Sequence, residues 1–117
     1  MGHGICHIEI PCKDLQRIKD FYGSIFGWTF TDSGEMYTVF STGEGPGGGF
    51  DLRTDSDPVS RSIVLYIEVE DIPLYLEKIS GAGGKIIQEK TEISKEFGYC
   101  ALFADSEGNT LGIWSET

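Results

Sequence analysis

Positive charge is scarce in this sequence. Nine Lys and Arg stand against 19 Asp and Glu, so the formal net charge at pH 7 is -10. Phosphate groups are bound by clustered Lys and Arg, and their shortage therefore argues against a nucleic-acid partner. It also argues against binding to an anionic membrane surface. The acidic residues are scattered along the chain, which is typical of a charged, solvated surface.

Long apolar runs and paired cysteines are also missing. No run approaches the roughly 18 residues that cross a bilayer. The first ten residues lack a signal-peptide pattern, so we expect a cytoplasmic protein that does not bind membranes. The three cysteines, Cys6, Cys12 and Cys100, form no CxxC pair, and we expect three buried or half-buried thiols without disulfides. A reactive thiol at Cys12, near an expected helix start, is the alternative.

The 117 residues, 39% of them hydrophobic, are enough for one globular domain. In the first half, an Ile-rich stretch predicts a strand that ends before Pro11. Asp14 is a suitable N-cap, and apolar residues spaced three and four apart predict a helix that ends at Gly27. A Gly/Pro loop is expected at 43–49, at the rim of any binding site. The strands expected in this half are 5–10, 28–31, 36–41 and 50–53.

The second half repeats this pattern. Asp71 is again an N-cap, and the glycines at 81–84 end the second helix. The expected strands are 62–69, 85–90, 99–104 and 110–114. These assignments divide the chain into a first module at 1–54, a polar linker at 55–61 and a second module at 62–117.

The repeat itself predicts the fold. A shift of 57 residues superimposes four pairs: His7 and Val64, Glu9 and Tyr66, Asp14 and Asp71, and Gly27 and Gly84. Each βαβββ unit is too small to bury both of its faces alone. We therefore expect an α+β fold in which two units form a curved, mixed sheet of eight strands. The helices would cover the convex face and leave a cup on the concave face.

Alternation along the first strand places His7 and Glu9 on one face and the apolar side chains between them on the other. The apolar face suits the helix, so His7 and Glu9 are expected to point into the cup. Tyr66 and Glu68 lie on the corresponding face of the second module. Ionisable residues on an inner face favour a functional role.

The order of several short motifs resembles the vicinal oxygen chelate superfamily of glyoxalases, bleomycin-resistance proteins and extradiol dioxygenases. The similarity covers nearly the whole chain and is greatest to short glyoxalase-related members. The motifs are His7-Ile8-Glu9-Ile10-Pro11, Phe26-Gly27-Trp28, Gly47-Gly48-Gly49, Phe103-Ala104-Asp105-Ser106-Glu107-Gly108-Asn109 and Gly112-Ile113-Trp114.

This resemblance implies paired modules, a homodimer and four ligands from the first and last strands of each module. Such ligands chelate a divalent ion such as zinc, nickel, iron or manganese. The first position falls on His7. If Gly47 corresponds to Gly108, then the residue that corresponds to Gly112 is Asp51, which is the candidate for the second position. The third and fourth fall on Val64 and Gly112, which supply no ligand. A catalytic zinc site normally needs three protein ligands, so the usual glyoxalase I reaction is not expected.

The sequence therefore favours a small-molecule binder with a degenerate metal site. Cups at a dimer interface would hold an aromatic or cationic ligand, helped by the acidic charge and by aromatic walls. One alternative is a metal-dependent lyase, isomerase or dioxygenase that uses His7, and another is a non-catalytic interaction module. The expected ligand-contacting residues are His7, Glu9, Tyr66, Glu68 and Trp114, and the further aromatic wall candidates are Trp28, Tyr37 and Phe103.

Overall fold

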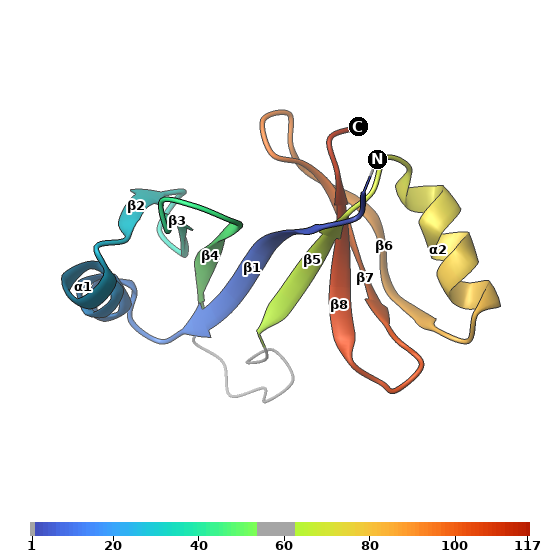
Figure 1. Ribbon diagram of the computed structural model, residues 1–117, viewed down its shortest axis with the longest axis horizontal. Helices are drawn as coiled ribbons and strands as arrows, with labels where there is room; N and C mark the ends of the chain where they lie inside the picture. Colours follow the sequence, from blue (N-terminus) through green and yellow to red (C-terminus); the bar gives the residue numbers. More distant parts are fainter. Residues whose placement is uncertain (1, 54–62) are drawn as a thin grey trace. The chain divides into compact units, whose positions relative to one another are not determined.

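The computed structural model describes residues 2–53 and 63–117, and its elements follow the order βαβββ twice. The eight strands form one sheet in the order β2-β3-β4-β1-β5-β8-β7-β6, which confirms the predicted α+β fold and its repeat (Figure 1). The predicted linker lies outside the described residues. The first five elements are β1 (Ile5–Cys12), α1 (Leu15–Phe26), β2 (Thr29–Asp32), β3 (Tyr37–Ser41) and β4 (Gly47–Leu52). The others are β5 (Val64–Glu68), α2 (Ile72–Gly81), β6 (Lys85–Ser94), β7 (Gly98–Ala104) and β8 (Thr110–Ser115).

The chain divides into two compact units. One unit is His7–Val64, and the other joins Met1–Cys6 to Leu65–Thr117. We call them the first-repeat unit and the second-repeat unit. Strand β1 contributes its first residues to the second-repeat unit, where the Glu68 N–H donates to the Gly4 carbonyl over 3.0 Å. The curvature of the sheet and the cup stay predictions.

The first-repeat unit is built around aromatic rings on the α1 side of its strands. Asp14 caps α1 by accepting a hydrogen bond from the Arg17 N–H over 3.0 Å, and Gly27 ends it at φ 71°, as predicted. Phe50 of β4 is fully buried and stacks on Tyr22 of α1 with ring centroids 5.4 Å apart. The remaining members of this aromatic cluster are Trp28, Phe30 and Phe40.

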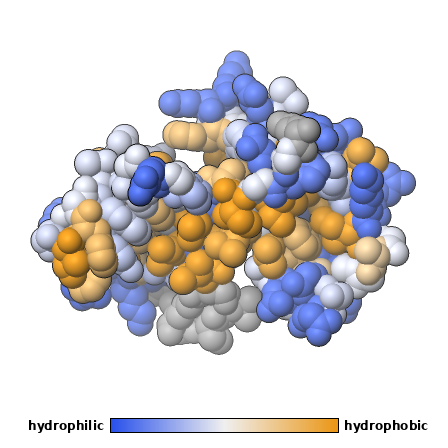
Figure 2. Space-filling model, viewed as in Figure 1, coloured by the Kyte–Doolittle hydropathy of each residue, from blue (hydrophilic) through white to orange (hydrophobic). Residues whose placement is uncertain are grey.

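Helix α1 buries only part of its apolar surface. Phe21, Ile25 and Phe26 keep 55%, 56% and 61% of their surface exposed. Figure 2 shows apolar atoms at the surface over α1, at the left of the view. The apolar side chains that predicted this helix are therefore only partly covered. Tyr22, on the side nearest β4, makes its ring contacts with the cluster.

Two strand boundaries differ from the sequence prediction. Strand β4 begins at Gly47, so the three glycines at 47–49 belong to a strand and not to the rim loop. Strand β1 continues through Pro11 to Cys12, whose carbonyl accepts a hydrogen bond from the Arg53 N–H over 2.8 Å. A proline removes one donor from a strand, but it keeps the carbonyl and permits extended backbone, which explains the continuation.

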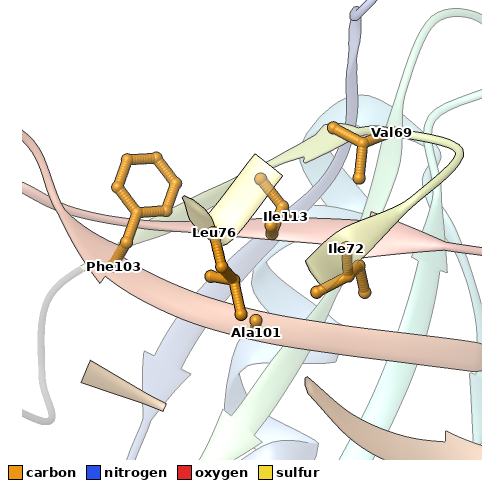
Figure 3. Packing of buried hydrophobic residues seen from close by; sticks show 6 residues of the cluster. All are labelled: Val69, Ile72, Leu76, Ala101, Phe103 and Ile113. Atoms are coloured by element: carbon orange, nitrogen blue, oxygen red, sulfur yellow. The ribbon is translucent and has the colours of Figure 1, made fainter. Parts of the chain in front are cut away.

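The second-repeat unit has a hydrophobic core between α2 and the sheet (Figure 3). Asp71 caps α2 by accepting a hydrogen bond from the Leu74 N–H over 3.1 Å. Phe103, expected as a wall of the cup, belongs to this core instead, because its strand β7 turns it toward α2. The labelled core residues are Val69, Ile72, Leu76, Ala101, Phe103 and Ile113.

Two expectations about cysteine and membranes can be compared with the described residues. The three cysteines are half-buried and form no disulfide. Burial raises the pKa of the Cys12 thiol, which disfavours the reactive thiolate considered above. Within residues 2–53 and 63–117, no helix is both long and apolar enough to cross a membrane.

Candidate functional site

The candidate site lies on the face of the first-repeat unit opposite the aromatic cluster. Strands β1 and β4 pair in parallel, with His7 opposite Gly47, Glu9 opposite Gly49, and Ile10 opposite Phe50. Because side chains alternate along a strand, His7 and Glu9 lie on the other face from Phe50 and α1. This is the orientation expected from the sequence.

Tyr37 reaches from β3 across β4 to His7 of β1 on this face. It lies on β3, two residues from Val39, which pairs with Gly49 of β4. A Cβ atom at Gly49 would overlap the Tyr37 hydroxyl and ring, so the ring crosses β4 directly above this glycine. The hydroxyl then lies 2.8 Å from His7 Nε2. Glycine at position 49 is therefore required for Tyr37 to reach β1.

The same hydroxyl also acts on the pKa of Glu9. Burial raises the pKa of the Glu9 carboxyl, and the Asp51 charge adds to this, whereas Arg53 and the Tyr37 hydroxyl lower it by less. Burial lowers the pKa of the His7 imidazole. Near neutral pH the imidazole is therefore uncharged, and Glu9 takes up a proton more readily than an exposed glutamate.

Asp51 lies further along β4 beside Arg53. Its Oδ2 atom forms an ion pair with Arg53 Nε over 2.8 Å, and both side chains are half-buried. Burial raises the pKa of Asp51, and Arg53 lowers it by less. Asp51 pairs in register with Pro11 and Tyr37. His7, Glu9, Tyr37, Asp51 and Arg53 thus form one polar cluster, which we call the β1–β4 cluster.

The remaining predicted ligand-contacting residues belong to the second-repeat unit. Tyr66 and Glu68 of β5 pair with Gly112 and Trp114 of β8, so the four residues share one sheet face. A Cβ at Gly112 would overlap the Tyr66 ring. The space left by the missing side chain at Gly112 is therefore filled by Tyr66. The Trp114 indole N–H donates to the Phe97 carbonyl over 2.6 Å.

The described residues do not fit the metal centre that the resemblance implies. Within residues 2–53 and 63–117, no three His, Cys, Asp or Glu side chains lie together in a way that could hold an ion. His7 Nε2 is engaged by Tyr37, and the register places Gly49 at the position that corresponds to Gly112. Catalytic zinc sites normally use three protein ligands, and the described residues bring together fewer than three.

Sequence reasoning missed the central position of Tyr37 and the presence of Arg53. Tyr37 was expected only as an aromatic wall, and Trp28, expected beside it, packs in the α1 cluster. The glycines at 47–49 are the sequence feature that could have indicated the position of Tyr37. Three consecutive glycines inside a strand indicate that other groups approach its backbone closely. The Phe40 ring lies over Gly48 on one face, and Tyr37 lies over Gly49 on the other.

Comparisons with known proteins extend these observations. The model of the Glyoxalase/Bleomycin resistance protein/Dioxygenase superfamily matches residues 4–113. A glyoxylase-like domain-containing protein of Didymella fabae is 31% identical over 120 residues, which cover 95% of this chain and 93% of that protein. The anthracycline biosynthesis protein DnrV of Streptomyces peucetius is 25% identical over 91% of this chain and 44% of its own length. The crystal structure of methylmalonyl-CoA epimerase from Mycobacterium tuberculosis shares the fold, with a TM-score of 0.78, 14% identity, and coverage of 97% of this chain and 88% of that chain.

Proposed function

As this chain belongs to the Glyoxalase/Bleomycin resistance protein/Dioxygenase superfamily, we propose that it binds an aromatic or cationic small molecule without a metal ion. The ligand would lie on the β1–β4 cluster, in contact with His7 and Glu9. The observation that carries this proposal is the half-buried His7 imidazole, 2.8 Å from the Tyr37 hydroxyl, on the same strand face as the half-buried Glu9 carboxyl and turned away from α1. Ionisable groups withdrawn from water in this way are typical of binding sites.

The charges of the cluster support a cationic ligand. Glu9 and Asp51 supply two carboxyl groups, whereas Arg53 is the cation that lowers the pKa of both. The net charge of -10 attracts cations to the protein at long range as well. The expectation that Tyr66, Glu68 and Trp114 contact a ligand stays a prediction for the second-repeat unit by itself.

A thermal-shift screen tests this function. The probes are aromatic amines, guanidinium compounds and neutral aromatic compounds, each at several concentrations. A ligand at 100 times its Kd stabilises the native state by about 2.7 kcal/mol, which raises the Tm by several degrees. Glu9→Gln should abolish the shift, and Glu92→Gln, at an exposed carboxylate of β6, should leave it unchanged. The proposal fails if no compound raises the Tm, or if Glu9→Gln leaves every shift intact.

Elemental analysis separates this function from a metal-dependent lyase, isomerase or dioxygenase. Protein purified without a chelator should carry no stoichiometric zinc, nickel, iron or manganese. A stoichiometric metal that is lost in both His7→Ala and Asp51→Asn would support the metal-dependent enzyme and refute a metal-free site. The same metal in Asp51→Asn but not in His7→Ala would restrict the ligand role to His7.

We also propose that the protein forms a homodimer, as the family resemblance implies. The apolar side chains exposed on α1, Phe21, Ile25 and Phe26, support an association that covers them. Light scattering coupled to size exclusion measures the mass directly. A mass near 13 kDa at micromolar concentration would refute the dimer, since one chain is 12.9 kDa.

A further inference from the structure

Arg53 and Asp51 form an ion pair inside the β1–β4 cluster, with Asp51 Oδ2 2.8 Å from Arg53 Nε. The Arg53 N–H donates to the Cys12 carbonyl over 2.8 Å, so Arg53 continues the ladder between β1 and β4. Since side chains alternate along a strand, Arg53 lies on the same sheet face as Asp51. Because the two partners are only two residues apart on one strand, little chain entropy opposes their pairing.

The surroundings of this pair strengthen it. The side chains of Arg53 and Asp51 keep only 36% and 24% of their surface exposed, and the Nε atom itself is buried. Water therefore screens the attraction between the two charges less than it would at an open surface. The Nε–H is not aligned with an acceptor among the described residues, so the attraction is mainly that of opposite charges.

Glu9 has no ion-pair partner among the residues that the structure describes. It stands opposite Gly49, whereas Asp51 stands opposite Pro11, so the two carboxyl groups lie on one face and two residues apart along the ladder. Arg53 acts on Glu9 from beyond ion-pair distance, and it lowers the pKa of Glu9 less than burial raises it. The cluster thus contains one carboxyl group paired with a guanidinium and one carboxyl group without a cation.

We propose that Arg53 neutralises Asp51, so that Glu9 alone pairs with the ligand and the site selects aromatic ligands that carry one positive charge. The inference rests on the proposed function and specifies the charge of its ligand. Arg53 is a positioning residue, because it acts on the ligand through Asp51. Removal of the guanidinium would release a second carboxylate beside Glu9 on the same face, and the altered site should then prefer a dication.

Isothermal titration calorimetry at pH 8, in buffer that contains a chelator, tests this selectivity. The probes are benzylamine, which carries one ammonium group, and 1,3- and 1,4-bis(aminomethyl)benzene, which carry two. The wild type should bind benzylamine and the diamines with similar affinity. Arg53→Gln should bind at least one of the diamines about fivefold more tightly than benzylamine, as expected for one additional ion pair.

A second variant and a control separate this effect from a general disturbance of the fold. Arg53→Gln/Asp51→Asn should lose the preference for diamines again, because the released carboxylate is gone. Lys19→Gln breaks the Lys19–Asp32 ion pair elsewhere in the first-repeat unit and should leave the wild-type selectivity unchanged. An Arg53→Gln variant that binds diamines and benzylamine equally overturns the inference, and so does a wild type that already prefers the diamines fivefold.

Two double-variant cycles in urea measure the pairing in ligand-free protein. Asp51→Asn and Arg53→Gln should be coupled, with a midpoint of the double variant about 0.3 M above the additive value. Glu9→Gln and Arg53→Gln should be additive. Coupling of Arg53 to Glu9 that equals its coupling to Asp51 overturns the inference and leaves ligand binding intact. If both cycles behave as expected but no amine binds the wild type, the proposed function is refuted, whereas the pairing of Arg53 with Asp51 is confirmed.

Discussion

Substitution of Gly49 by alanine is the most direct test of the architecture of the β1–β4 cluster. The added Cβ would overlap the Tyr37 ring and hydroxyl, and Gly49 is itself buried in β4. Overpacking of this kind costs about 1–3 kcal/mol. Alanine also restricts the unfolded chain more than glycine does, which stabilises the folded state by about 0.5–1 kcal/mol. The net loss in the free energy of unfolding should be about 1–2 kcal/mol.

Urea unfolding measures this loss. With an m-value of about 1–3 kcal/mol/M, the midpoint should fall by on the order of 1 M. Gly81→Ala is the matched control, since no atom lies within 4 Å of the added Cβ at the end of α2, and its midpoint should stay or rise slightly. Tyr37→Ala removes the ring that the new methyl group meets. The double variant Gly49→Ala/Tyr37→Ala should therefore be more stable than additivity predicts by about 1 kcal/mol or more. Strict additivity would refute the close approach of Tyr37 to β4.

Three further outcomes follow from the structure. Gly112→Ala should lower the free energy of unfolding by about 1–2 kcal/mol in urea, because its Cβ would overlap the Tyr66 ring; an unchanged midpoint would contradict that contact. Asp14→Ala should cost about 1 kcal/mol through loss of the α1 cap, whereas Asp20→Ala on the same helix should cost clearly less. The raised pKa of Glu9 means that the folded state binds its proton more tightly than the unfolded state, so this contribution to stability is present below pH 4.5 and is lost as the pH rises through the folded pKa. Glu9→Gln should thus become more stable relative to the wild type between pH 4 and pH 7, and a constant difference in urea midpoint would count against the burial of this carboxyl.

The sequence predicted those features of the fold that depend on local chemistry. The caps at Asp14 and Asp71 start both helices, and alternation in β1 places His7 and Glu9 on the face opposite α1. These predictions succeed because a cap or an alternation involves residues that are close in sequence. The length of β6 was underestimated, since a ten-residue strand with register shifts obeys no simple alternation.

The site was harder to predict because it depends on register between strands that are distant in sequence. Tyr37 and His7 are thirty residues apart, and only the pairing of β3, β4 and β1 brings the hydroxyl to the imidazole. The count that suggested Asp51 as the second ligand position assumed that Gly47 corresponds to Gly108. The observed register pairs Glu9 with Gly49 and Tyr66 with Gly112, so Asp51 corresponds to Trp114. Whether Asp51 binds a metal stays a prediction for elemental analysis.

These two registers show a similar arrangement in both repeats. Glu9 and Tyr66 are superimposed by the internal repeat, and each stands opposite a glycine on the last strand of its own module. In both modules a tyrosine ring lies over that glycine, from β3 in the first and from β5 in the second. A ring in this place prevents a side chain at the glycine, and an introduced carboxylate would have to displace it. Gly49→Glu or Gly112→Glu alone should therefore destabilise the protein without creating metal affinity, because each introduces overpacking before it introduces a ligand.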